Sequence, residues 1–392
     1  MIPSLRRRRS TPTRFTATSA VALTVVILSA CSLNNTDTTG GDNTSPAAQT
    51  RPACTSSESF SQPLATLTPA TDPRVGQGPC TTRLPERGSV AAVSPGTQTL
   101  PTTVTSHDPT GGVDVTVTDT SRIVAFDISG SIGQTIFALG YGKNLVGRDV
   151  ATSFPDTSDI PIVTGSSHSI NIESVIALDP SLVITDGSIG PLDVVLQLRD
   201  AGIPLVFVDS TPSITGSVEK AQQVALALGD PEAGEELSTK LNADINQVIS
   251  DIQALAPQNP EDRVRIAFLY VRGSASVYYL FGQGSGADDL IRALNGVDVA
   301  SEIGWVGEKP MTDEALIEAN PDLLLLMTKG LDSVGGPEGL TKTLQSTALT
   351  NAGKNLNIID MTDSQIMTFG PRTAEVLDAL ARAIYSRDAA TE

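Results

Sequence analysis

The chain has 392 residues, of which 40% are hydrophobic, and a formal net charge of −18 at pH 7. A chain this acidic is not expected to bind nucleic acid or anionic lipid headgroups, because binding phosphate requires basic surface. Its three cysteines and two histidines form no cluster with the spacing of metal ligands, so the sequence gives little support for a bare metal centre.

Residues 1–30 have the features of an export signal. Four arginines at positions 6–9 precede an apolar stretch from Ala20 to Leu28, and small residues lead to Cys31. This pattern is typical of a signal that is removed and not of a spanning helix. Without residues 1–30, which hold five arginines and no acidic residue, the formal charge becomes about −23.

The run Leu28-Ser29-Ala30-Cys31 resembles the lipobox of bacterial lipoproteins. The resemblance implies that Cys31 carries a diacylglycerol and becomes the N-terminus of a protein held on the extracytoplasmic face of the cell membrane, since buried acyl chains anchor a protein to lipid. An ordinary signal peptide with a chance cysteine is the alternative.

Residues 31–118 are rich in Thr, Ser, Pro, Gly, Asp and Asn and show little apolar periodicity. We predict a flexible tether, because such a composition cannot bury enough apolar surface to fold. His107 lies in this segment and is expected to be a solvated loop residue. Cys54 and Cys80 could pair outside the cell, without being central to the fold.

Short apolar runs then alternate with helical patterns, which predicts α/β lobes with mostly parallel sheets. In a Rossmann-like N-terminal lobe, residues 119–213, we expect strands at 123–126, 145–147, 182–185 and 205–208 and helices at 131–139, 172–178 and 192–201. Residues 214–258 predict a long connecting helix that Gly229-Asp230-Pro231 interrupts. A similar C-terminal lobe, residues 259–388, is expected to hold strands at 264–271, 277–280, 323–327 and 356–360 and helices at 287–294, 312–319 and 371–385.

Two segments of the predicted lobes look alike. Each has a short helix with an early glutamate, a proline seven residues later and then an apolar strand; the glutamates are Glu173 and Glu314, and the prolines are Pro180 and Pro321. Two lobes with one topology would produce this repetition.

From about Arg122 to Tyr385 the chain resembles the helical-backbone class of ABC-transporter substrate-binding proteins, which handle siderophores, cobalamin and haem. The repeated segments and Gly370-Pro371-Arg372 carry the resemblance best. It implies two lobes joined by a long helix, a ligand cleft between them, and docking of Glu173 and Glu314 on permease arginines. An acid favoured by the helix dipole is the alternative explanation for each glutamate.

The residues also suggest a haem site. Tyr270 and Arg272 lie two apart on a predicted strand and therefore point the same way. A nearby cation favours the ionised form of a phenol, and Tyr is an accepted ligand of haem iron. Within the class, the chain resembles haem-binding lipoproteins of haem uptake systems, which implies that His168 and Tyr270 bind Fe(III) haem from opposite lobes while Arg272 hydrogen-bonds the tyrosine oxygen.

The remaining expectations concern partners and rivals. Arg372 could meet a haem propionate, and surface haem-relay proteins are conceivable partners besides the permease and its ATPase. Each of the three site residues has an alternative interpretation. Tyr270 could be a core tyrosine, His168 a loop histidine and Arg272 a structural ion-pair residue. A siderophore or cobalamin binder with the same fold remains open, as does a surface adhesin. An enzyme is not expected, because no Gly-x-Ser-x-Gly elbow or carboxylate pair with a histidine occurs.

Overall fold

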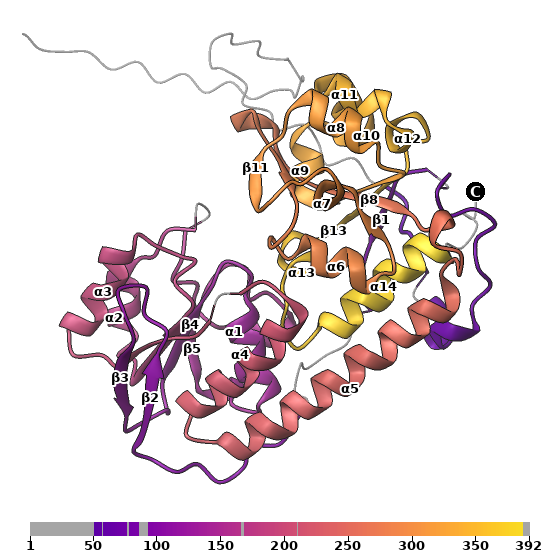
Figure 1. The fold of residues 1–392 in the computed structure, drawn as a ribbon. Helices are drawn as coiled ribbons and strands as arrows, with labels where there is room; N and C mark the ends of the chain where they lie inside the picture. The colour runs from indigo at the N-terminus through magenta and orange to yellow at the C-terminus, as the bar shows by residue number, and fades with distance from the viewer. Residues whose placement is uncertain are drawn as a thin grey trace, which may run out of the picture. The chain divides into compact units, whose positions relative to one another are not determined.

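The computed structural model describes residues 51–56, 58–76, 78–85, 93–165, 168–209 and 211–386 (Figure 1), all of them in the compact unit Ser45–Glu392. The predicted signal at residues 1–30 and Cys31 lie outside the described residues. Among the helices that the structure describes, none is long and apolar enough to cross a membrane.

The first lobe is built on a four-stranded parallel sheet in the order β5-β4-β6-β7. Both faces are covered, since Ile123 of β4 packs in one apolar core and its neighbour Val124 in another. The expected elements are present, with these bounds: β4 (Ile123–Phe126), α1 (Ser131–Ala138), β5 (Leu145–Arg148), α2 (Ile172–Ala177), β6 (Leu182–Thr185), α3 (Leu192–Asp200) and β7 (Leu205–Phe207).

A hairpin that the sequence did not predict precedes β4. Its strands are β2 (Thr102–Ser106) and β3 (Val113–Val117), which pair antiparallel. The hairpin is fixed to β7, because the Ser106 hydroxyl accepts a hydrogen bond from the Phe207 N–H at 2.8 Å and the His107 N–H donates to the Phe207 carbonyl at 2.8 Å. This part of the predicted tether is therefore folded onto the first lobe, while the His107 side chain is exposed, as expected.

Two helices connect the lobes, and the predicted break between them is confirmed. They are α4 (Ile214–Ala227) and α5 (Pro231–Leu255). Asp230 begins α5, since its carboxylate accepts from the Ala233 N–H at 3.1 Å and from the Tyr141 hydroxyl at 2.6 Å. The start of α5 packs in the core of the first lobe, and its later part, including Ile252, packs in the core of the second.

The second lobe is built on a seven-stranded mixed sheet with the order β1-β13-β12-β8-β9-β11, in which β10 also pairs with β8. The strands β9 and β11 are antiparallel to their neighbours and the rest are parallel. The strands are β8 (Arg265–Arg272), β9 (Val277–Phe281), β10 (Val297–Asp298), β11 (Glu308–Pro310), β12 (Leu323–Met327) and β13 (Ile358–Met361). The helices are α6 (Ala287–Ala293), α7 (Val299–Glu302), α8 (Asp313–Ala319), α9 (Thr328–Ser333), α10 (Gly336–Thr343), α11 (Gln345–Leu349), α12 (Asn351–Lys354), α13 (Asp363–Ile366) and α14 (Thr373–Tyr385), the last of which packs along α5 (Figure 1).

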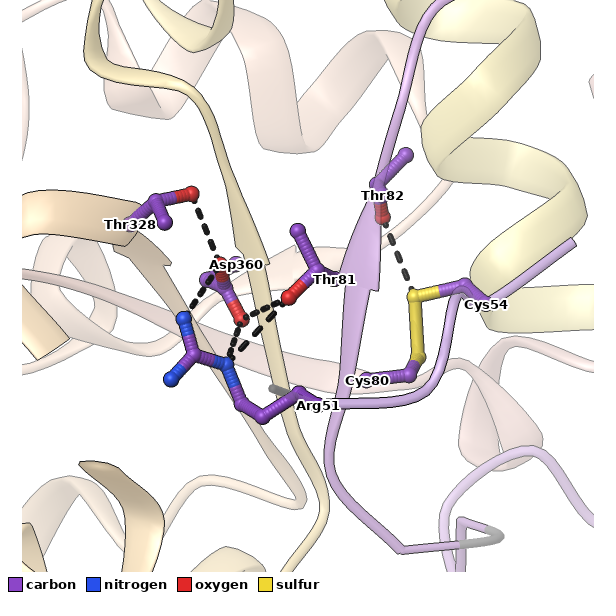
Figure 2. The surroundings of a disulfide bond; sticks show 7 residues. All are labelled: Arg51, Cys54, Cys80, Thr81, Thr82, Thr328 and Asp360. Atoms are coloured by element: carbon purple, nitrogen blue, oxygen red, sulfur yellow. Dashed lines mark hydrogen bonds and ion pairs between the residues drawn. A yellow bond between two sulfur atoms is a disulfide. The ribbon is translucent and has the colours of Figure 1, made fainter. Parts of the chain in front are cut away.

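The edge strand of this sheet comes from the N-terminal part of the chain. Strand β1 (Cys80–Thr82) pairs parallel with β13, and Cys54 forms a disulfide with Cys80 (Figure 2). We call residues 51–56, 58–76 and 78–85 the N-terminal strap. The sequence predicts a flexible tether here, whereas the strap is part of the second lobe, and the disulfide joins two segments that are both buried against it.

A buried arginine secures the strap. Arg51 holds the carboxylate of Asp360 through two nitrogens, at 2.8 and 3.1 Å (Figure 2). Its third nitrogen lies 2.7 Å from Asp332. Thr81 and Thr328 donate to the same Asp360 carboxylate at 3.1 and 2.7 Å. Because Asp360 is completely buried, this bidentate pairing is what makes its charge tolerable in the core.

Candidate ligand site

Tyr270 and Arg272 lie on the same face at the end of β8, as their spacing predicts. Both side chains are half-buried, whereas Val271 between them is buried on the opposite face. The Arg272 Nε donates a hydrogen bond to the Tyr270 hydroxyl oxygen at 2.7 Å, and the guanidinium carbon lies 5.3 Å from the centre of the ring. Arg272 thus contacts Tyr270 twice, through a hydrogen bond to its hydroxyl oxygen and a cation–π contact with its ring.

Two aromatic rings of β9 lie beside this phenol. The Tyr279 ring lies 6.3 Å from that of Tyr270 and nearly perpendicular to it, and the Phe281 ring lies 6.1 Å away and nearly parallel. Cross-strand pairing explains the arrangement, since Tyr270 is opposite Tyr279 and Phe268 is opposite Phe281. The indole nitrogen of Trp305 donates to the Leu280 carbonyl of β9 at 2.9 Å.

His168 is presented by a turn in the first lobe. Its φ of 56° is left-handed, a conformation in which histidine is enriched among non-glycine residues, and its N–H donates to the Gly165 carbonyl at 3.1 Å. The side chain is not needed to begin α2, because the Asn171 side chain accepts from the Ser174 N–H at 3.0 Å. Within the described residues, the buried His168 Nδ1 has no hydrogen-bond partner.

The second lobe acts on His168 electrostatically. Burial lowers the pKa of His168 below its ordinary value, and the positive charges of Arg272 and Lys329 lower it further, while Asp363 acts in the opposite direction. A lowered pKa keeps the imidazole neutral near pH 7, which is the form that binds a metal. The charge of Arg272 therefore reaches both candidate ligands, Tyr270 through a hydrogen bond and His168 through space.

Lys329 and Asp363 were not singled out from the sequence. They lie in the first turns of α9 and α13, and the Lys329 backbone N–H donates to the Asp363 carboxylate at 3.0 Å. No motif marks them, because their relevance depends on which strand ends lie together in the fold. The predicted site residue Arg372 differs, since Glu375 neutralises it through contacts of 2.6 and 2.9 Å and it is not among the charges that act on His168.

Three aspartates, two of them buried and one half-buried, lie where the strands of the first lobe end. Asp127, Asp149 and Asp186 each follow a strand directly: β4, β5 and β6. Burial and the charge of Asp127 raise the pKa of Asp149 to about 7 and that of Asp186 to about 6. Among the described residues, no group of three or more His, Cys, Asp or Glu is arranged to hold a metal ion.

The two repeated glutamates are exposed on equivalent helices. Glu173 lies in the first turn of α2 and Glu314 in the first turn of α8. Among the described residues, neither carboxylate takes part in a salt bridge or a side-chain hydrogen bond, so both are available to a partner.

Comparison with known proteins decides the family. Residues 128–365 match the model of the family described as periplasmic binding protein, which is more than half of the chain. The chain belongs to this family. It is a substrate-binding protein of an ABC transporter and not an enzyme, and the resemblance noted in the sequence is confirmed at this level.

Individual relatives differ in what their names say they bind. The chain is 26% identical over 295 residues to an uncharacterized ABC transporter substrate-binding lipoprotein, YvrC of Bacillus subtilis, covering 74% of this chain and 87% of that protein. It is 24% identical over 288 residues to a cobalamin-binding protein of Halobacterium salinarum, covering 72% and 74%. Among solved structures, the haem-binding protein HmuT matches with a TM-score of 0.74 and 36% identity, covering 81% of this chain and 100% of that one. Solved variants of HmuT replace an arginine, a histidine and a tyrosine by alanine.

Proposed function

We propose that this protein captures Fe(III) haem outside the cytoplasm and delivers it to an ABC permease. The observation that carries the proposal is the 2.7 Å hydrogen bond from Arg272 to the Tyr270 oxygen at a strand end, with the charge of Arg272 also acting on His168 of the other lobe. The similarity to haem-binding HmuT supports the same ligand class.

In this proposal the iron is bound from both sides. Tyr270 binds as tyrosinate, a hard anionic ligand suited to Fe(III), and His168 fills the second axial position as neutral imidazole. Arg272 compensates the negative charge on the Tyr270 oxygen. With both axial positions filled, water and peroxide are excluded from the iron, so the protein carries haem without chemistry.

Absorption spectra of hemin titrated into the protein test the ligand assignment. Tyr270→Phe and His168→Ala should each shift the Soret band and weaken hemin binding. The chain offers matched controls: Tyr278 lies on the opposite face of β9, and His107 is exposed and is the other histidine of the chain. Tyr278→Phe and His107→Ala should bind hemin as the wild type does. Unchanged spectra in the Tyr270 and His168 variants would rule out the ligation.

Cobalamin is the second candidate ligand, because a relative covering 72% of this chain is named a cobalamin-binding protein. A ferric siderophore is a third possibility with the same fold. Competition experiments distinguish these ligands. If aquocobalamin or a ferric siderophore is the true ligand, added hemin should fail to displace it. Binding of hemin at equimolar ratio, with no spectral change of added cobalamin, is the expected result.

Membrane attachment and permease docking complete the proposal. Cys31 carries the lipid anchor at the extracytoplasmic face of the membrane, a view that the lipoprotein name of the YvrC relative supports. Glu173 and Glu314, one on each lobe, pair with basic residues of the permease. Surface haem-relay proteins are candidate donors of the haem. Cys31→Ser should release the protein from membranes into the soluble fraction while leaving hemin binding intact.

A further inference from the structure

The helices α2 and α8 match in more than their glutamates. Val175 of α2 and Leu316 of α8 are both completely buried. A left-handed residue, Asp179 or Asn320, follows each helix within two residues and directly precedes a proline. The two helices therefore turn corresponding faces toward the interior and toward solvent.

Each solvent-facing side carries an exposed isoleucine beside the glutamate. Ile176 is 45% exposed and Ile317 is 43% exposed. They lie three residues after Glu173 and Glu314, a spacing that makes two side chains neighbours on a helix surface. The other exposed position differs, since Ala177 of α2 corresponds to Glu318 of α8. Each lobe thus carries a glutamate and an exposed isoleucine at equivalent surface positions.

A single exposed isoleucine needs no explanation, because scattered apolar residues are normal on protein surfaces. Here the exposure recurs at the same position of both lobes, next to a carboxylate that has no partner among the described residues. In the first lobe Ile162, 48% exposed, and Glu173 line the same shallow surface hollow, which extends the apolar surface around that glutamate.

We propose that Ile176 and Ile317 are apolar anchors of the surface that docks on the permease, each entering an apolar recess beside the basic residue that pairs with Glu173 or Glu314. This rests on the proposed docking role of the two glutamates. An ion pair left open to water contributes little to binding. Apolar side chains that exclude water around it strengthen the contact, as residues surrounding binding hot spots do.

The charge and repetition define the partner. It presents the same combination, a basic residue with an apolar recess, at two places, as a permease with two similar halves does. A docking site of this kind is specific for a protein surface, because a lipid headgroup layer offers no recess to receive a branched side chain.

The test is binding to the haem-importing permease–ATPase complex of the source organism, reconstituted in lipid nanodiscs and measured by biolayer interferometry. Ile176→Ser and Ile317→Ser should each weaken binding about tenfold and the double variant about a hundredfold, the loss that follows from removing an interface anchor. Thermal unfolding checks that the variants fold. Leu226→Ser on α4 is the matched control, because Leu226 is also 45% exposed and has no glutamate partner of this kind; it should bind like the wild type.

The outcomes separate this inference from the proposed function. Hemin titration reports on haem binding independently of docking, and the nanodisc measurement works with or without hemin. A double variant that binds the permease within twofold of the wild type would overturn the inference, as would an equal loss in Leu226→Ser or a wild-type protein that does not bind. Failure to bind hemin would instead overturn the haem assignment alone.

Discussion

The two lobes present their candidate ligands by different means. Tyr270 projects from a regular strand, is held by Arg272 and lies beside two aromatic rings of β9. His168 projects from a turn with left-handed backbone. The second lobe is further braced by a disulfide and a buried arginine, whereas the ends of the first sheet carry buried aspartates.

The bracing reaches β8, the strand that carries Tyr270 and Arg272. Arg51 holds Asp332 in α9 at 2.7 Å, and the Ser333 hydroxyl next to it accepts a hydrogen bond from the Gly273 N–H at 2.8 Å. Gly273 directly follows Arg272. The strap thus supports, through α9, the end of the strand that positions Tyr270 and Arg272. A network of hydrogen bonds therefore holds the Tyr270 side of the candidate site, whereas a turn holds the His168 side.

The largest expected effect comes from breaking the brace. Arg51→Met leaves the fully buried Asp360 carboxylate without its cation, and we expect the free energy of unfolding to fall by about 3–5 kcal/mol. Urea denaturation measures it. Arg74→Met is the control, because Arg74 and its partner Asp72 are each 36% exposed and such pairs contribute at most about 1 kcal/mol. Equal losses would contradict a special role for Arg51.

Removing the disulfide should be the next largest effect. Cys54 and Cys80 are 26 residues apart, and the entropy of a loop of that length corresponds to about 3.5 kcal/mol. The double variant Cys54→Ser/Cys80→Ser should lose that amount in urea denaturation. Wild-type protein denatured after reduction of the disulfide should match the variant, and an unfolding free energy that does not change on reduction would show that the bond contributes nothing.

The first lobe should respond to pH through Asp149. Its pKa is raised to about 7 in the folded protein, so the folded state binds a proton that the unfolded state loses near pH 4. The resulting stability is present at low pH and is lost as pH rises through about 7, on the order of 2 kcal/mol between pH 5 and pH 8. Asp149→Asn should reduce this pH dependence in urea denaturation, whereas Asp193→Asn, at an exposed position of α3, should leave it unchanged.

The smallest expected effect sharpens the comparison at the site. Arg272→Met removes the hydrogen bond to the Tyr270 oxygen while leaving both candidate ligands, and we expect hemin affinity to fall about 10–100-fold, the usual loss for a residue that orients a metal ligand. Arg372→Met should have less effect, because Glu375 already neutralises Arg372. Hemin titration compares the two, and a larger loss for Arg372 would reverse their assigned roles.

Much of the fold was predictable where the signal is local. Buried parallel strands read as apolar runs, as in β6 and β12, and Gly229-Asp230-Pro231 marks the break between α4 and α5. The shared face of Tyr270 and Arg272 follows from the period of a strand.

The strap and the hairpin could not be predicted because their signal is not local. Strand β1 is Cys-Thr-Thr, which becomes a strand only because β13 offers it an edge, with Cys80 opposite Ile359. Arg51 finds Asp360 across 309 residues of sequence. The threonine-rich composition of β2 likewise obscures its alternation of exposed and less exposed residues. Lys329 is relevant because its charge lowers the pKa of His168, an effect that depends on the fold and not on a local motif.

The strap also limits the distance between the lobes and a membrane to which Cys31 is attached. If Cys31 is lipidated, 20 peptide steps separate it from Arg51, which is fixed to the second lobe, and not the 88 residues of the segment predicted as a tether. A chain of that length spans at most about 70 Å even when fully extended. A connection of this length keeps the binding protein and its ligand close to one region of the membrane. The local concentration of the binding protein near the transporter therefore rises without any increase in affinity.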